Sequence, residues 1–301
     1  MTLGVKISGG LGNQLFQLCF AHSLHLSSSE KIFLDIEEFQ TFNFPQLSPL
    51  LLMPIDSCEF GTFVKRRSGL PFLGRKQVLT EKVLSSKTPA VKADQKLTIV
   101  NENYRQFVPN FLELKQAYFT GTFSSYKYWH SGFNSTIEWV TNNVSRLPMD
   151  DGNFSSYDLS VHARRGDYIS NPKTRFFHGY CDTTYFDKAF RLIKYHDASI
   201  DSVLVSSDDS IFASELRTIA AKYFGEVHIL EEDSALEALL QLSKCKSFIG
   251  SNSTFSWWAG YLSPKDIRIF PSDWYLSKKI NFSQELLFPY KPVLIDDALV
   301  Q

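Results

Sequence analysis

The sequence lacks an excess of charge of either sign, because 31 lysines and arginines balance 32 aspartates and glutamates in 301 residues. No overall field favours a nucleic acid or an anionic membrane as partner, so a negatively charged ligand requires a local cluster of cations. The sequence also has no apolar run near the ~18 residues that cross a bilayer, and it starts without an apolar signal segment. Its four cysteines follow neither a C-x-x-C nor a metal-binding spacing. We therefore expect a reduced, cytoplasmic protein without a transmembrane segment.

Short apolar stretches alternate with amphipathic ones through much of the chain. Near the N-terminus, strands are expected at residues 5–8 and 32–35 on either side of a helix at 14–26, a parallel βαβ unit. In the second half, strands are expected at 159–162, 202–206, 227–230, 247–250 and 268–270, with a helix after each of the first four. This alternation predicts a doubly wound parallel sheet.

Two segments differ from this pattern. Residues 38–108 are irregular and predict only short helices and loops, and the turn-rich residues 147–153 predict a linker. The fold class expected is therefore α/β, with two Rossmann-like, doubly wound domains that face a cleft. Residues 1–152 would form the first domain and residues 153–301 the second.

The strongest chemical pattern is HARRGDY at residues 162–168, where a predicted strand ends. In open α/β sheets, ligands bind outside the carboxyl ends of the strands. Arg164 and Arg165 offer forked, permanently charged donors that suit phosphate oxygens and a leaving group on which negative charge develops. The alternative is a structural network in which Asp167 holds Arg165, and the sequence leaves both interpretations open.

A second pattern, SNSTFSWW at residues 251–258, follows a strand and opens a helix. Asn252, Ser253 and Thr254 could present donors to an anion there, aided by the helix dipole. Ordinary helix capping by serine or threonine is the competing interpretation. The paired tryptophans are more typical of a core than of a stacking platform.

The third pattern is GGLGNQ at residues 9–14, which approaches a dinucleotide-binding fingerprint. Leu15 occupies the position of the third glycine and would crowd the packing of helix on strand, which argues against NAD. A tight turn at Gly10, with the amides of Asn13 and Gln14, suits the hydroxyl groups of a sugar. The alternative is a simple strand-to-helix turn.

Three further side chains are weaker candidates. Asp208 ends a strand before a helix, where helix capping is the favoured interpretation and a contact with a ribose or a base is the alternative. His178 lies in an expected loop, and its imidazole could serve as a base. Glu237 lies on an expected helix, where a solvated face is the competing interpretation.

Together these motifs closely resemble the bacterial alpha-1,2-fucosyltransferases of glycosyltransferase family 11. The likeness runs from residue 5 to about residue 275 and includes GTFSSYKY at residues 121–128. It implies a GT-B arrangement with an N-terminal acceptor domain, which carries Gly10, Asn13 and Gln14 on the acceptor side, and a C-terminal domain for GDP-fucose. It also implies inversion at the anomeric carbon without a metal ion or other cofactor, in keeping with the lack of a convincing D-x-D pair at a strand end.

Carried over residue by residue, the resemblance places Arg164 and Arg165 at the GDP phosphates, with Ser253 and Thr254 assisting. His162 and Asp167 would shape that strand end, and Asp167 and His178 are both candidates for the base. The sequence departs from the family pattern at Ser124, Ala163 and Ala238. The last departure affects the nucleotide-base contact, for which Glu237 is the substitute.

The expected reaction is transfer of L-fucose from GDP-β-L-fucose to the 2-hydroxyl group of a terminal galactose-type residue of a glycan. The expected partners are GDP-fucose and that glycan but no nucleic acid, and a peripheral association with the inner face of the membrane is compatible with the sequence. Three alternatives stay open: a GT-B transferase with another nucleotide sugar, a Rossmann oxidoreductase that uses NAD, and an inactive glycan-binding protein. The acceptor itself is not specified, because residues 38–110 contain no recognisable motif.

Overall fold

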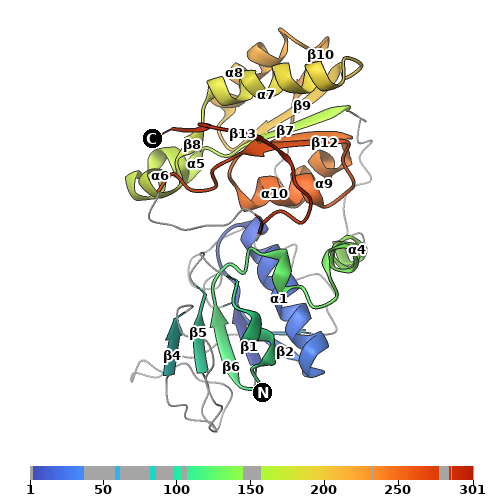
Figure 1. Ribbon diagram of the computed structural model, residues 1–301. Helices are drawn as coiled ribbons and strands as arrows, with labels where there is room; N and C mark the ends of the chain where they lie inside the picture. Colours follow the sequence, from blue (N-terminus) through green and yellow to red (C-terminus); the bar gives the residue numbers. More distant parts are fainter. Residues whose placement is uncertain are drawn as a thin grey trace. The chain divides into compact units, whose positions relative to one another are not determined.

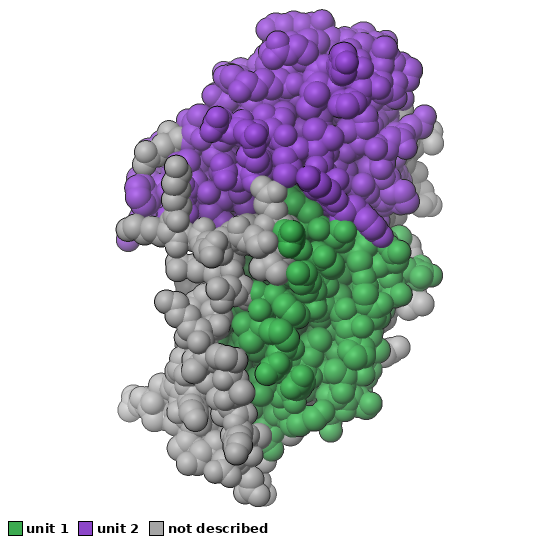
Figure 2. Space-filling view, in the orientation of Figure 1, with its two compact units in different colours: residues 1–147, 285–289 green, residues 148–284, 290–301 purple. Residues whose placement is uncertain are grey.

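A computed structural model describes residues 3–36, 58–61, 82–85, 98–102, 107–144, 157–231, 234–277, 285 and 287–300. The chain divides into two compact units (Figure 2). Unit 1 comprises residues 1–147 and 285–289, and unit 2 comprises residues 148–284 and 290–301. The predicted linker from residue 147 and the predicted boundary at 152/153 fall within residues 145–156, outside the described residues.

Unit 1 contains a six-stranded parallel sheet in the order β3-β2-β1-β6-β5-β4. Its strands are β1 (Leu3–Lys6), β2 (Ile32–Asp35), β3 (Cys58–Gly61), β4 (Lys82–Ser85), β5 (Thr98–Asn101) and β6 (Ala117–Thr120). The chain runs outward from β1 to β3 and returns from the opposite edge to β6, so the strand order reverses between β1 and β6. The expectation of only short helices and loops at 38–108 is wrong, because β3, β4 and β5 lie there.

Unit 1 has four described helical elements and an aromatic core beside α1. The helical elements are α1 (Leu11–Ser28), η3 (Pro109–Glu113), η4 (Tyr126–Tyr128) and α4 (Phe133–Val144). Phe20 on α1 stacks on Phe123 with ring centroids 4.0 Å apart and meets Phe119 edge-on at 5.1 Å. All three rings are fully buried, so this cluster contributes strongly to the packing of α1 on the sheet.

Unit 2 contains a second six-stranded parallel sheet, in the order β10-β9-β7-β11-β12-β13. Its strands are β7 (Leu159–Ala163), β9 (Ser202–Ser207), β10 (Glu226–Ile229), β11 (Ser247–Gly250), β12 (Ile267–Pro271) and β13 (Val293–Ile295). The five strands expected from the sequence are confirmed. The edge strand β13 and a small antiparallel ribbon of β8 (Tyr180–Cys181) and β14 (Leu299–Val300) had no signal in the sequence.

The helices of unit 2 cover both faces of its sheet. They are α5 (Gly166–Ser170), α6 (Pro172–His178), α7 (Thr183–His196), α8 (Ser210–Ala220), α9 (Ala235–Lys244) and α10 (Thr254–Tyr261). Figure 1 shows α7 and α8 on one face and α9 and α10 on the other, as expected when right-handed crossovers run in both directions from the centre of the sheet. Trp257 and Trp258 on α10 are both 0% exposed, which confirms their assignment to the core.

The α/β fold class with two Rossmann-like units is thus confirmed, while the cleft expected between the domains stays a prediction. Among the described residues, no helix is long and apolar enough to cross a membrane.

Candidate functional site

The candidate site of unit 2 lies where the strand order reverses, between β7 and β11. Such a reversal opens a crevice outside the carboxyl ends of the two strands, which is where open α/β sheets bind ligands. Arg164 and Arg165 follow β7, and Ser251 to Thr254 follow β11. The backbone N–H of Arg164 donates to the Ser251 hydroxyl at 2.9 Å, which ties the two loops together. The two strongest sequence motifs therefore form a single site.

The side chain of His162, on β7, is buried and contacts the start of α10. Its Nδ1 lies 2.6 Å from the hydroxyl of Ser256, which in turn lies 3.1 Å from the hydroxyl of Ser251. Burial, with a contribution from the charge of Arg164, lowers the pKa of His162 to about 3. The imidazole is therefore neutral at physiological pH, and its visible role is to hold the two loops in place.

Arg164 is held by two carboxylates. One terminal nitrogen of its guanidinium lies 2.5 Å from Asp167 Oδ1 and the other lies 2.7 Å from Asp208 Oδ2. The side chain nevertheless keeps 36% of its surface exposed, so an anion has access to it. Asp167 thus pairs with Arg164, and the structural alternative in which it holds Arg165 is wrong.

Asp208 connects both arginines. Besides its ion pair with Arg164, it accepts the backbone N–H of Arg165 at 2.6 Å. A Cβ on Gly166 would lie 2.5 Å from the Asp208 carboxylate, so this close approach requires glycine at that position. The adjacent Asp209 caps α8 by accepting the N–H groups of Ile211 and Phe212, both at 3.1 Å. Capping therefore belongs to Asp209, and Asp208 shapes the arginine site.

Arg165 has a different environment from Arg164. Its guanidinium carbon lies 4.7 Å from the ring centre of Tyr180 and 4.1 Å from that of Phe212, and only 16% of the side chain is exposed. Its Nε is buried and has no hydrogen-bond partner in the described part of the chain, with Asp209 Oδ2 3.9 Å away. This aromatic clamp orients Arg165. Its contact with a phosphate stays a prediction.

His178 ends α6 beside Tyr168 and Asn252. The Tyr168 hydroxyl lies 3.3 Å from His178 Nδ1, and the two rings stack with centroids 4.7 Å apart. Burial lowers the pKa of His178 to about 4, although Asp167 acts in the opposite direction. The low pKa makes His178 a neutral but weak base. The other base candidate, Asp167, forms an ion pair with Arg164. The sequence did not single out Tyr168 as their neighbour.

The loop after β11 is fixed mainly by Asn252 and Ser253. Asn252 is 0% exposed, and its amide nitrogen donates to the backbone oxygens of His178 at 2.9 Å and Trp274 at 3.2 Å. Ser253 caps α10 by accepting the N–H of Phe255 at 3.2 Å, and Thr254 is the first residue of that helix. Helix capping is thus confirmed for Ser253, and binding of an anion by this helix start stays a prediction.

Glu237 lies in the first turn of α9 and is half-buried. Because α9 leads from β10 back to β11, this turn is at the same edge of the sheet as the arginines. Among the described residues, no hydrogen bond or ion pair links its side chain to the site. A contact of Glu237 with the nucleotide base stays a prediction.

The acceptor-side candidates occupy the matching place in unit 1, after β1 and next to the reversal between β1 and β6. Gly10 precedes the first turn of α1, and its carbonyl accepts the N–H groups of Asn13 and Gln14. The Gln14 side chain is fully buried, and its amide nitrogen donates to the carbonyl of Gly9 at 2.8 Å. Its Oε1 is buried without a hydrogen-bond partner among the described residues. The turn is therefore an ordered polar structure, and binding of an acceptor by Gly10, Asn13 and Gln14 stays a prediction.

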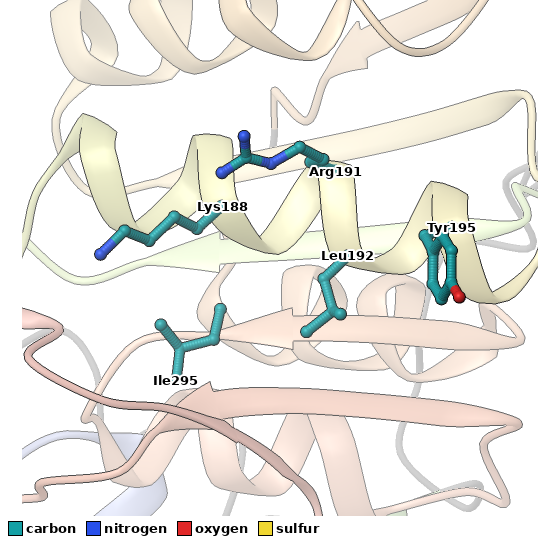
Figure 3. A pocket seen from close by; sticks show the side chains of 5 residues that line it. All are labelled: Lys188, Arg191, Leu192, Tyr195 and Ile295. Atoms are coloured by element: carbon teal, nitrogen blue, oxygen red, sulfur yellow. The ribbon is translucent and has the colours of Figure 1, made fainter.

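The structure has a pocket that contains none of the predicted site residues. It lies beside α7 and is lined by Lys188, Arg191, Leu192, Tyr195 and Ile295 (Figure 3). Within the described ranges, no group of three or more histidine, cysteine or acidic side chains could hold a metal ion. All four cysteines are free and buried.

The chain is similar to known glycosyltransferases over most of its length. Residues 2–288 match the family described as glycosyl transferase family 11. An alpha-1,2-colitosyltransferase of Escherichia coli is 24% identical over 292 residues, which cover 92% of this chain and 93% of that protein. The O-antigen biosynthesis glycosyltransferase WbnK of Escherichia coli is 38% identical over 119 residues, 38% of each chain.

Among solved structures, a point mutant of Arabidopsis thaliana FUT1 in complex with GDP has a TM-score of 0.50 to this chain at 13% identity. The match covers 93% of this chain and 72% of that one. At this identity the likeness concerns the fold alone.

Proposed function

The chain belongs to glycosyl transferase family 11, and on that basis we propose that it transfers L-fucose from GDP-β-L-fucose to the 2-hydroxyl group of a terminal galactose-type residue. One observation supports this most directly. Arg164, oriented by Asp167 and Asp208, lies at the strand reversal of unit 2 with more than a third of its side chain exposed. A cation in that position suits a diphosphate leaving group.

The proposed mechanism is a single displacement at the anomeric carbon. As the bond to the diphosphate breaks, negative charge grows on the leaving oxygen while the fucose ring becomes oxocarbenium-like. Arg164 stabilises that charge, because it is a donor already in place before the reaction. The acceptor hydroxyl attacks from the opposite face, so a β-linked donor yields an α-linked product. Asp167 or His178 accepts the proton late in the reaction.

Transfer of colitose is a second candidate, because a colitosyltransferase matches nearly the whole chain. Colitose is fucose without its 3-hydroxyl group. A site that hydrogen-bonds that hydroxyl discriminates against the deoxy sugar by a factor of about 10⁴. The value of kcat/KM for GDP-fucose divided by that for GDP-colitose therefore separates the two donors. A ratio well below one would reassign the reaction to colitose.

GDP is expected to raise the melting temperature at concentrations where UDP and NAD do not. A ligand that binds only the folded state stabilises it by about 2.7 kcal/mol at a hundred times its Kd, and the nucleobase must account for the difference because the diphosphate is shared. Thermal unfolding with each nucleotide is the measurement. Equal stabilisation by UDP would favour a transferase with another nucleotide sugar, and stabilisation by NAD alone would favour the oxidoreductase.

With GDP-fucose and lactose or another terminal β-galactoside, the expected products are GDP and an α1,2-linked fucoside. Proton NMR checks both parts, because the anomeric coupling reports the α-configuration and the shift of galactose H2 reports the linkage. A β-linked product would contradict inversion. Since one relative is an O-antigen biosynthesis transferase, galactose-terminated O-antigen fragments belong in the acceptor panel.

Activity is expected to be unchanged in excess EDTA. The reason is that Arg164 offers the phosphates a permanent positive charge, and the sequence has no convincing D-x-D pair at a strand end. Initial rates with and without EDTA test this, with a Mn²⁺-dependent transferase assayed in parallel to show that chelation is complete. Loss of activity that Mn²⁺ or Mg²⁺ restores would show that a metal supplies this charge.

A further inference from the structure

Three strands of unit 1 end in a network of polar side chains around the reversal between β1 and β6. Gln17, fully buried on α1, accepts the backbone N–H of Ser8 after β1 at 2.9 Å. Its amide nitrogen donates to the carbonyl of Gly121 after β6 at 2.7 Å. Glu102 follows β5, the other neighbour of β6, and its N–H donates to the Thr120 carbonyl at 2.7 Å. The ends of β1, β5 and β6 are thus joined at the edge where a parallel sheet binds ligands.

The turn that follows β6 has an unfavourable backbone conformation. Gly121 has a φ of 151°, and Phe123, an aromatic residue with a Cβ, has a φ of 50°. A bulky residue with a Cβ rarely adopts this left-handed conformation, because its side chain clashes with the backbone. Contacts with the surrounding residues must therefore hold the turn. Backbone strain of this kind concentrates at ligand-binding and catalytic sites.

Two sets of contacts hold the turn. The Phe123 ring is buried and stacked on Phe20. One carboxylate oxygen of Glu102 accepts the N–H of Thr122 at 3.1 Å and that of Phe123 at 3.0 Å. The Glu102 side chain is almost fully buried, at 5% exposure, and none of its hydrogen bonds to described residues involves a cation. Burial of a carboxylate that has no cation beside it costs free energy, so packing alone does not explain why a glutamate occupies this position.

The held turn carries groups suited to a saccharide. The hydroxyls of Thr122 and Ser124 lie 3.4 Å apart. Thr122 is buried and its side chain hydrogen-bonds Glu102, whereas the Ser124 side chain is only half-buried. Across the reversal, in the first turn of α1 after β1, lies the buried Gln14, whose Oε1 has no hydrogen-bond partner among the described residues. Hydroxyl and amide groups that are fixed in space provide the donors and acceptors with which proteins bind sugar hydroxyls.

We infer that Glu102 is a positioning residue that holds the turn of residues 121–124 so that the Ser124 hydroxyl binds the acceptor sugar. The inference rests on the proposed function for the nature of the acceptor. It assigns acceptor recognition in unit 1 to the end of β6 in addition to the β1–α1 turn. Glu102 itself acts through the turn, by accepting two of its backbone N–H groups and by its hydrogen bond with the Thr122 side chain.

The test compares Glu102→Met, which keeps the size of the side chain but removes the acceptor oxygens, with Glu102→Gln, which keeps one. Glu102→Met is expected to raise the KM for lactose at least tenfold and to change the KM for GDP-fucose less than twofold. Glu102→Gln is expected to stay within threefold of the wild type in both. A matched control is Tyr118→Phe, which removes a buried hydroxyl that donates to Asp35 at 2.5 Å in the same sheet. It is expected to lower Tm and leave the KM for lactose unchanged.

Binding of lactose without any donor, followed by saturation-transfer NMR, separates this inference from the proposed reaction. Signal is expected with the wild type and Glu102→Gln. A loss is expected with Glu102→Met and with Ser124→Ala, which serves if the methionine variant fails to fold. Unchanged signal in both variants, equal loss in Tyr118→Phe, or no lactose signal from the wild type would overturn the inference. Failure of the wild type to use GDP-fucose, with this binding pattern intact, would count against the proposed donor only.

Discussion

Replacing Arg164 with alanine is expected to lower turnover at least a hundredfold, about 3 kcal/mol of lost transition-state stabilisation. The guanidinium is already oriented by Asp167 and Asp208 and needs no rearrangement when charge develops on the leaving diphosphate. Arg164→Lys is expected to recover little, because an ammonium group lacks the planar fork that two carboxylates and a phosphate can share. The measurement is kcat at saturating GDP-fucose and acceptor.

Arg191→Ala is the matched control, since Arg191 is an exposed arginine on α7 that lines the pocket containing none of the predicted site residues. It is expected to keep wild-type turnover. Folded Arg164→Ala with near wild-type turnover would make the arginine motif structural and remove the main support for the proposed mechanism.

Arg165→Ala is expected to lower turnover by a similar factor but also to lower Tm. The reason is that Arg165 is packed between Tyr180 and Phe212, and its loss leaves both rings without their partner. Comparing the Tm of the two variants therefore separates the exposed arginine from the clamped one.

Replacing Glu102 with glutamine is expected to remove a pH dependence of stability worth about 3 kcal/mol. Burial raises the pKa of Glu102 from 4.5 to about 7, although hydrogen bonds from Phe123 and Thr122 act in the opposite direction. Between these two values the unfolded chain has lost the proton while the folded protein keeps it, so stability falls as the pH rises. Below pH 4.5 the full contribution is present, and above about pH 7 it is lost.

Urea unfolding of wild type and Glu102→Gln at pH 5 and pH 8 measures this effect. The variant is expected to gain on the wild type as the pH rises, because its amide does not titrate. Glu138→Gln, an exposed position on α4 in the same unit, is the control and should show no such gain. An equal difference between wild type and Glu102→Gln at both pH values would mean that the Glu102 pKa is not raised.

The sequence by itself determined the features that depend on residues close to one another along the chain. Apolar runs of strand length alternate with helices in unit 2, so its strands and the motifs at their ends were predictable. Because parallel strands place their carboxyl ends at one edge, the motifs after β7 and β11 could be assigned to one site. The serine motif also carried its capping chemistry locally, in Ser253.

Only the tertiary structure decided which groups meet across strands. The strands β3, β4 and β5 lie in a part of the sequence without a regular alternation of apolar and amphipathic stretches, and they are stabilised by pairing with other strands of the sheet. In unit 2, β7 and β9 pair with Ala163 opposite Ser207, which brings Asp208 beside Arg164 from more than forty residues away. In unit 1, Asn101 pairs with Thr120, which sets Glu102 against the turn after β6. Register depends on burial of one face and on the whole sheet, so neither carboxylate could be matched to its partner from the sequence.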